Sequence, residues 1–231
     1  MTRLFLKAIV IPSLLLLCSN AFDYFLFCQR WPETVCRFVD NKKNCEIPKN
    51  TTGFIIHGLW PSNIKGNDPS FCNSSDHKFN PNEINSILPY LNQQWPDLFG
   101  SNEKELFWNH EWSKHGTCCR ESSIIKTEFD YFNGGLKLRN RFPILDYLSH
   151  KNIKPSATQT FDFDDVRNAI EQGVGNKVNI NCKNEDGISY LGEVHICLTD
   201  DLYTEDCSDD SHHTCYDKIK IVGYNTNSVV V

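Results

Sequence analysis

Ten cysteines spread along the chain constrain its fold more than any other feature. The 231 residues include eleven cysteines, of which Cys18 falls within an apolar segment at the N-terminus. The remaining ten run from Cys28 to Cys215, and an even number in a secreted chain indicates a framework of disulfides. A zinc site is not indicated, because the cysteines do not form CxxC pairs or Cys/His pairs at ligand spacing.

The first 21 residues have the organisation of a secretory signal peptide. Arg3 and Lys7 precede an apolar run from Ala8 to Cys18, and the small residues Ser19-Asn20-Ala21 follow it. Cleavage after Ala21 would leave residues 22–231 as the mature chain. A retained membrane anchor is the alternative, but the apolar run is shorter than the about 20 residues that span a bilayer. We therefore expect a protein that is secreted or held in a vacuole or another endomembrane compartment, with no membrane association.

The mature chain is acidic. Loss of Arg3 and Lys7 takes the formal net charge from −6 to −8. This charge argues against tight, non-specific binding of nucleic acid, although an enzyme that contacts a few phosphates locally remains compatible with it. Because secreted proteins can be N-glycosylated, the acceptor motifs at Asn50 and Asn73 predict two glycosylation sites.

The order of periodic segments predicts one α+β domain over residues 22–231. Repeats, low-complexity tracts and long linkers are absent from the sequence. We expect a mainly antiparallel sheet packed with helices. Aromatic and β-branched runs predict strands over 22–31, 52–57, 188–198 and 218–223, and helical spacing or capping residues predict helices over 82–94, 102–116, 129–142 and 164–173.

The segment HEWSKHG at residues 110–116 crowds titratable groups on one predicted helix. Residues four apart share a helix face, which pairs Glu111 with His115 and His110 with Lys114. A carboxylate orients an imidazole, and a fixed positive charge suits an anion that gains charge in a transition state. His110 and His115 are five apart, unlike the histidines of HExxH metalloproteases.

A second cluster lies in FIIHGLWP, where His57 closes a predicted strand before Gly58. Two histidines, a lysine and a carboxylate without a set of metal ligands fit metal-free phosphoryl transfer. One histidine takes a proton from a hydroxyl and the other gives a proton to the leaving oxygen. The 2′-hydroxyl of RNA lies beside its own phosphate and supplies the nucleophile, whereas DNA lacks this group.

FIIHGLWPSN and FWNHEWSKHGTC resemble the two active-site segments of the ribonuclease T2 family. FDYFLFCQRWPETVC, DPSFC and YLGEVHIC extend the resemblance over essentially the whole mature chain, with plant S-like ribonucleases and self-incompatibility S-ribonucleases as the nearest types. The resemblance implies a ribonuclease T2-like α+β fold, a monomer without cofactor or metal, and cleavage of single-stranded RNA. The products would be 2′,3′-cyclic phosphates and then 3′-phosphates.

Residue roles follow from the same resemblance. His57 matches the general acid and His115 the general base, while Glu111 and Lys114 match residues that stabilise the transition state. His110 matches a phosphate-binding histidine. Trp60 matches an aromatic that stacks on the first base. Arg30, Asn63, Asn92 and Phe107 complete the expected substrate-binding set.

The resemblance also implies a disulfide pattern. It pairs Cys36 with Cys45, Cys72 with Cys118, Cys182 with Cys215, and Cys197 with Cys207. Elimination then predicts a fifth bridge between Cys28 and Cys119, with an exchange of Cys118 and Cys119 as the alternative. Four tryptophans are expected in the core (Trp31, Trp95, Trp108 and Trp112), and five histidines are expected to be surface or structural (His77, His150, His195, His212 and His213).

Three biological roles are compatible with these features. The acidic charge favours an S-like enzyme for phosphate scavenging, defence or senescence, because self-incompatibility ribonucleases are usually basic. A self-incompatibility ribonuclease that acts in pollen rejection, with an F-box-type pollen partner, is the alternative. A storage or binding protein on an inactive scaffold is a third hypothesis.

Overall fold

A computed structural model describes residues 22–39, 44–49, 51–100, 105–208 and 214–224. Its sheet runs in the order β2-β1-β5-β7-β3, and β4 and β6 also pair with β5. β5 and β7 run parallel, and the other pairs between named strands are antiparallel. The predicted α+β fold with a mainly antiparallel sheet is confirmed. The strands are β1 (Tyr24–Arg30), β2 (Ile55–Ser62), β3 (Phe161–Asp162), β4 (Asn179–Glu185), β5 (Ile188–Leu198), β6 (Thr204–Glu205) and β7 (Lys218–Lys220).

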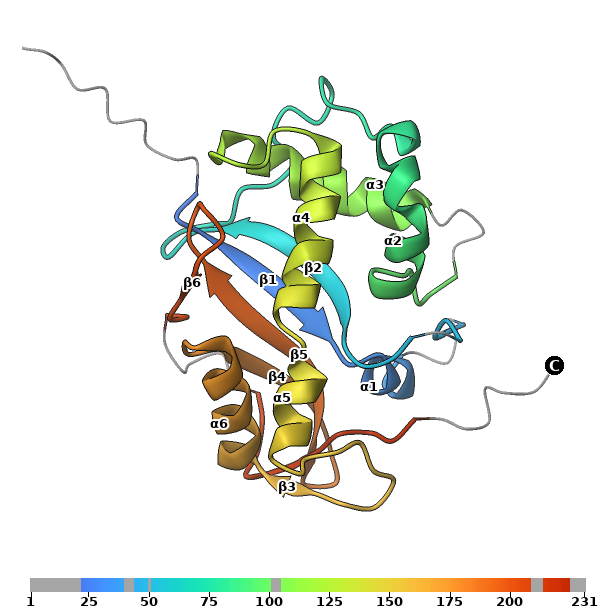
Figure 1. Cartoon of the computed structure of the whole chain (residues 1–231), viewed down its shortest axis with the longest axis vertical. Coiled ribbons are helices and arrows are strands. Elements are labelled where there is room, and N and C mark those ends of the chain that lie inside the picture. Colours follow the sequence, from blue (N-terminus) through green and yellow to red (C-terminus); the bar gives the residue numbers. More distant parts are fainter. Residues whose placement is uncertain (1–21, 40–43, 50, 101–104, 209–213, 225–231) are drawn as a thin grey trace, which may run out of the picture.

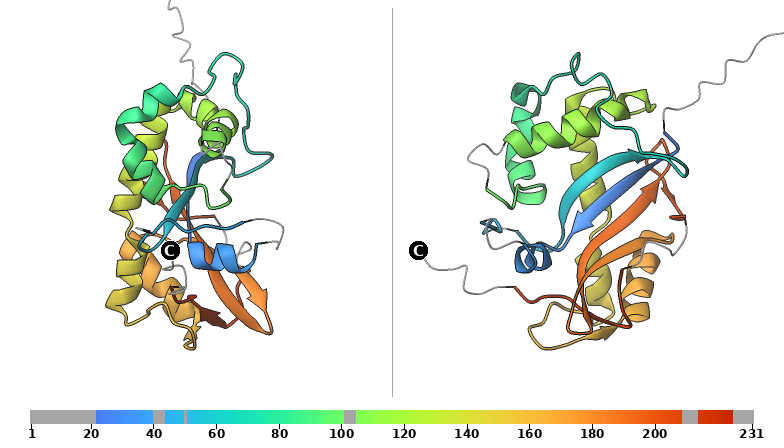
Figure 2. Two further views of the ribbon diagram at one scale, coloured as in Figure 1. Left: turned by 90° about the vertical axis from the view of Figure 1, so that its right-hand side faces the viewer. Right: turned by 180° about the vertical axis from the view of Figure 1, so that it is seen from behind.

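Helices cover one face of the sheet and leave the opposite face of its central strands open (Figures 1 and 2). α4 crosses this covered face and contacts β1 and β2. Gln29 of β1 points to the same side, since its side chain donates to the carbonyl of Phe142 at the end of α4. The helices are α1 (Pro32–Arg37), η1 (Pro81–Ile87), α2 (Leu88–Gln94), α3 (Glu105–Lys114), η2 (Gly116–Glu121), α4 (Glu128–Arg141), α5 (Ile144–His150) and α6 (Phe163–Val174).

Local patterns predicted several elements closely and missed others. The predicted helices 129–142 and 164–173 and strand 188–198 match α4, α6 and β5. The predicted helix 82–94 is instead a 3-10 segment followed by α2, with Pro89 in the first turn of α2, where a missing N–H does no harm. Strand 218–223 is shorter than predicted, and α1, α5 and β4 were not predicted. The first residues of the predicted helix 102–116, residues 102–104, lie outside the described residues.

The four tryptophans expected in the core are all buried. Their indole N–H groups donate to main-chain oxygens of Val222, His57, Trp95 and His77, for Trp31, Trp95, Trp108 and Trp112 respectively. A buried indole N–H needs such a partner. The aromatic core therefore also ties distant segments together by hydrogen bonds. Within the described residues, no helix has the length and apolar character needed to cross a membrane.

The structure forms the four disulfides that the resemblance implied: Cys36–Cys45, Cys72–Cys118, Cys182–Cys215 and Cys197–Cys207. The predicted fifth bridge is wrong, because Cys28 and Cys119 are both free and buried. The Cys28 sulfur lies 3.8 Å from Nδ1 of His57, whereas the Cys119 sulfur lies 3.3 Å from the carbonyl oxygen of His115. Each thiol therefore packs against a different histidine and not against the other thiol.

We expect two reactive thiols per molecule when a chain that begins at Phe22 is unfolded without reductant. The native protein should react with neither, because both sulfurs are buried and burial raises the pKa of each thiol well above its ordinary value. Titration with a thiol reagent before and after denaturation measures both numbers. Absence of any thiol in the unfolded chain would restore the fifth bridge.

Candidate active site

His57 is the extra residue of a β-bulge in β2. Cys28 of β1 lies opposite Gly58, and the next residue, Gln29, lies opposite Ile56, so that His57 has no partner in the ladder. The strand therefore does not end at His57, as predicted, but runs on to Ser62. The indole of Trp95 donates to the His57 carbonyl at 3.0 Å. A bulge re-aims a side chain, and here the core holds the bulged peptide in place.

α3 and the turn after it bring the second cluster to the same place. Glu111 and Lys114 lie in α3, and His115 follows its last residue, with its N–H still bonded to the Glu111 carbonyl at 3.0 Å. The Cys72–Cys118 bridge then anchors this turn to the loop that follows β2. The bridge at Cys118 thus fixes the end of α3.

Trp60 lies among the groups that the sequence singled out. Its indole N–H donates to Oε2 of Glu111 at 3.1 Å. Its ring centroid is 5.0 Å from that of His57 and 5.4 Å from that of His115. Residues from two segments more than 50 positions apart in the chain therefore meet around one indole.

Burial and positive neighbours keep His115 neutral. Burial, followed by the charges of Lys114, His110 and His57, lowers the pKa of His115 to about 3. Its Nδ1 is buried, without a hydrogen-bond partner among the described residues. A neutral imidazole at ordinary pH can accept a proton, which is what a general base requires.

Glu193 of β5 is a part of the site that the sequence analysis missed. One carboxylate oxygen lies 2.7 Å from Nδ1 of His57, and the other lies 3.0 Å from Nε2 of His195. Burial raises the pKa of Glu193, but hydrogen bonds from His195 and His57 outweigh it and hold the pKa well below its usual range. Glu193 is therefore an ionised carboxylate between two imidazoles.

His195 also belongs to this cluster, although it was predicted to be only surface or structural. Its side chain is 13% exposed, and its ring centroid lies 6.2 Å from that of Trp60. Residues two apart on a strand share a face. This alternation in GEVHIC could have linked Glu193 to His195, but nothing local pointed from either residue to His57.

Glu111 and His110, two further titratable groups of HEWSKHG, differ in exposure. Glu111 is buried, and burial raises its pKa, partly offset by His57, by the hydrogen bond from Trp60 and by positive neighbours. His110 is exposed at the surface, and desolvation together with the charge of Lys114 lowers its pKa. Lys114 thus adds positive charge beside both His110 and His115.

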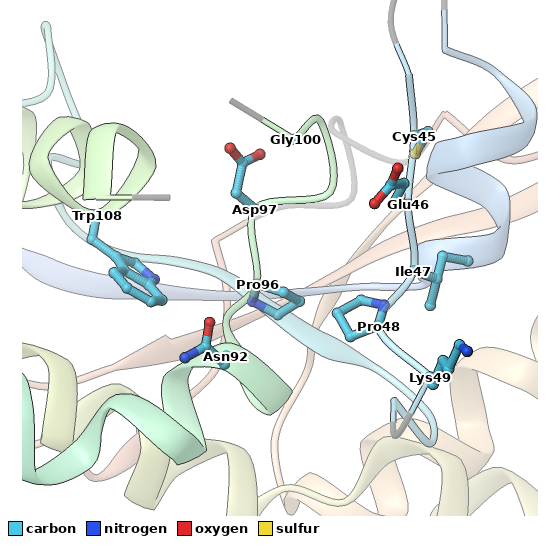
Figure 3. A pocket seen from close by; sticks show the side chains of 10 residues that line it. All are labelled: Cys45, Glu46, Ile47, Pro48, Lys49, Asn92, Pro96, Asp97, Gly100 and Trp108. Carbon is cyan, nitrogen blue, oxygen red and sulfur yellow. The ribbon is translucent and has the colours of Figure 1, made fainter. Parts of the chain in front are cut away.

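Arg30 and Phe107, two of the predicted substrate-binding residues, contact each other. The Arg30 guanidinium lies 5.6 Å from the centroid of the Phe107 ring, and it donates to the Pro96 carbonyl at 3.3 Å. Pro96 lines a pocket of about 570 Å³. Figure 3 shows Asn92 and Trp108 on one side of this pocket and the segment 45–49 on the other.

The side-chain amides of Asn63 and Asn92 hydrogen-bond to main-chain carbonyls and not to the imidazoles of the site. The Asn63 amide donates to the Asn67 carbonyl at 2.9 Å, and its backbone N–H donates to Asp68. The Asn92 amide donates to the Leu88 carbonyl within its own helix. Of the two predicted glycosylation positions, Asn73 is exposed, and Asn50 lies outside the described residues.

One group of potential metal ligands occurs among the described residues. The Cys28 sulfur, Nδ1 of His57 and a Glu193 oxygen lie within 4.8 Å of one another, and zinc accepts these ligand types. However, His57 and Glu193 already share a hydrogen bond of 2.7 Å, and Cys28 is a fully buried thiol with a raised pKa. A cation would have to displace protons from both contacts, so the geometry favours the hydrogen-bonded arrangement.

The model of the ribonuclease T2 family matches residues 22–207. The chain belongs to the ribonuclease T2 family. Ribonuclease DdI of Dictyostelium discoideum is 38% identical over 200 residues, which cover 86% of this chain and 84% of the relative. Ribonuclease Oy of Magallana gigas is 35% identical over 190 residues, which cover 80% of this chain and 87% of the relative.

A plant relative and a solved structure give the same assignment. Extracellular ribonuclease LE of Solanum lycopersicum is 35% identical over 202 residues, covering 84% of this chain and 85% of its own. The crystal structure of RNase NT in complex with 5′-AMP has a TM-score of 0.76 and 30% identity, covering 88% of this chain and 99% of the other. This T2 chain is accordingly an endoribonuclease, and its similarity extends equally to relatives outside plants.

Proposed function

We propose that the four residues His57, Glu111, Lys114 and His115 cleave single-stranded RNA by metal-independent transesterification. The observation that carries this proposal is the contrast between two imidazoles around Trp60. His115 is kept neutral by burial and positive charge, whereas His57 has an ionised carboxylate 2.7 Å from Nδ1. A neutral imidazole supplies the base, and an imidazole held by a carboxylate supplies the acid.

The reaction follows from these roles. Neutral His115 takes the proton of the 2′-hydroxyl, and the 2′-oxygen attacks the adjacent phosphorus. Lys114 and Glu111 stabilise the charge that develops on the phosphoryl oxygens, Lys114 as a cation and Glu111 as a hydrogen-bond donor when protonated. His57 gives its proton to the 5′-oxygen as the bond from this oxygen to phosphorus breaks. The product is a 2′,3′-cyclic phosphate. Water then opens the ring to a 3′-phosphate with the two histidine roles reversed.

A pair of RNA dinucleotides tests this proposal. Wild-type protein is incubated with a ribose dinucleotide and with its 2′-deoxy analogue, both in the presence of EDTA. Cleavage of the ribose substrate alone, with a cyclic phosphate that appears before the 3′-phosphate, is the expected result. Cleavage of the deoxy analogue, or loss of activity with EDTA, would contradict the mechanism.

The pKa of His115 predicts that activity extends into strongly acidic solution. The base works when it is neutral, which holds at pH above its pKa of about 3. The acidic limb of kcat/KM should therefore have its midpoint near that pH. Because the charge of Lys114 contributes to the low pKa, Lys114→Gln should move this limb to higher pH. An acidic midpoint near the ordinary histidine pKa of about 6.5 would contradict the prediction.

For substrate binding, we propose two base sites. Trp60 borders the catalytic groups and supplies an aromatic surface to the first base, with Asn63 in the loop beyond it. Arg30 and Phe107 contact each other, and Arg30 donates to the carbonyl of Pro96, which lines the pocket that also contains Asn92. Arg30, Phe107 and this pocket together supply the second base site. His110 is exposed beside Lys114, where it can contact a neighbouring phosphate.

We further propose that the protein is a secreted, glycosylated monomer that degrades extracellular or endomembrane RNA. Support comes from the signal-like N-terminus, the four disulfides and the exposed Asn73 acceptor. The acidic net charge favours scavenging, defence or senescence over a self-incompatibility role with a pollen partner. The similarity itself favours no plant role, because amoeba and oyster enzymes match as well as the tomato enzyme.

A further inference from the structure

We infer that Glu193 is the positioning residue of the general acid, holding His57 with its catalytic proton on Nε2. The inference deepens the proposed function and rests on it. Glu193 does not contact the reacting atoms in this role. It acts through His57, at a distance of 2.7 Å between Oε1 and Nδ1.

Two β-bulges bring these side chains together. The first makes His57 the unpaired residue of β2. The second lies in β5, where Asn181 opposes Glu193 and the next residue, Cys182, opposes Leu191, so that Gly192 is the extra residue. The Gly192 carbonyl accepts a hydrogen bond from the backbone N–H of Trp31 at 2.7 Å. A Cβ at Gly192 would lie 3.0 Å from the Asn181 carbonyl oxygen. Both bulged peptides are thus held by the core tryptophans.

The chemistry of the contact sets the tautomer of His57. An ionised carboxylate only accepts hydrogen bonds, so Nδ1 of His57 must be the donor. The protonated ring then carries its second, transferable proton on Nε2. After transfer the neutral ring keeps Nδ1–H on Glu193, which prevents the ring from presenting the wrong nitrogen.

The charges around His57 show why Glu193 carries this role. Its neighbours in β1, β5, α3 and the turn after α3 are Cys28, Glu193, Glu111 and His115. Cys28 is an uncharged thiol at 3.8 Å, and burial disfavours the ionised form of Glu111. Glu193 is the ionised partner in direct contact, and His195 and Arg30 add positive charge near it. The second hydrogen bond, from His195, keeps Glu193 ionised and fixed.

Two leaving groups separate a positioning role from a structural one. An RNA dinucleotide expels an alkoxide that needs a proton, whereas a uridine 3′-(4-nitrophenyl phosphate) expels a stable phenolate. Glu193→Gln should lower kcat/KM on the dinucleotide by about 10–100-fold, since acid catalysis contributes about 10²–10⁴-fold and only part depends on orientation. The loss on the aryl ester should be less than about threefold, because little acid catalysis is required there.

Rescue by the conservative variant gives an independent readout. Glu193→Asp should restore part of the activity, because it keeps the charge. Glu185→Gln is the matched control, since Glu185 lies on neighbouring β4 in an exposed ion pair with Arg37, and its activity should equal wild type.

A measurement on the wild-type protein covers the case in which the variant misfolds. Imidazole ¹⁵N chemical shifts, recorded at a pH high enough for the ring to be neutral, should show that His57 carries its proton on Nδ1. The opposite tautomer would overturn the inference, as would equal losses on both substrates. Failure of wild-type protein to cleave the dinucleotide would instead overturn the proposed function, and the ¹⁵N result would still decide the His57–Glu193 contact.

Discussion

Replacing His115 by alanine is expected to lower kcat/KM on an RNA dinucleotide by about 10²–10⁴-fold, the usual contribution of a general base. His115 has the strongly lowered pKa that suits this role. The same loss should appear with the aryl ester substrate, because the 2′-hydroxyl must lose its proton in both reactions. Steady-state kinetics on the two substrates measure this.

Controls separate lost chemistry from lost structure in this variant. The Nδ1 of His115 has no hydrogen-bond partner among the described residues, so truncation removes packing and leaves no new unpaired group behind. Thermal unfolding should therefore remain cooperative. His150→Ala, at the exposed end of α5, should keep full activity. A loss below about tenfold in a folded His115→Ala protein would contradict the assignment of the base.

Gly58→Ala is expected to damage the site without changing any titratable group. A Cβ at Gly58 would lie 2.0 Å from Nε1 of Trp60 and 2.7 Å from Oε2 of Glu111. Trp60 would have to move, which breaks its 3.1 Å hydrogen bond to Glu111. We expect at least about a tenfold loss of kcat/KM and a destabilisation of about 1–3 kcal/mol, typical of an overpacked core. Kinetics and denaturant unfolding measure the two effects.

Gly134→Ala provides the matched control in α4. A Cβ there meets nothing within 4 Å, so alanine should keep activity and stabilise the helix by about 0.5–1 kcal/mol. Gly135→Ala, one residue on, would meet the Trp95 ring at 2.4 Å and should destabilise the protein. If Gly58→Ala kept wild-type activity, the close packing of Trp60 against Gly58 and its hydrogen bond to Glu111 would be unnecessary for catalysis.

Local sequence was sufficient for elements whose information is local. α4 has its capping box at Thr127 and Asp130 and its apolar residues at helical spacing, and β5 is an eleven-residue strand whose side chains are mostly apolar. The segment 82–94 shows the limit of periodicity, because Pro89 restarts the helix within an apolar pattern that continues through it. The predicted pairing of Cys28 with Cys119 failed because elimination contains no distance information.

By itself, the sequence indicated ribonuclease chemistry, since His57, Trp60, Glu111, Lys114 and His115 lie in two short segments that resemble ribonuclease T2 motifs. It also indicated the α+β class, and its resemblance to the ribonuclease T2 family implied the four disulfides. Only the tertiary structure decided how these groups meet. Register between β1 and β2 makes His57 a bulge, and β5 brings Glu193 to it from 136 residues away. Such contacts depend on strand register and core packing, which join distant residues through space and leave no periodic signal along the chain.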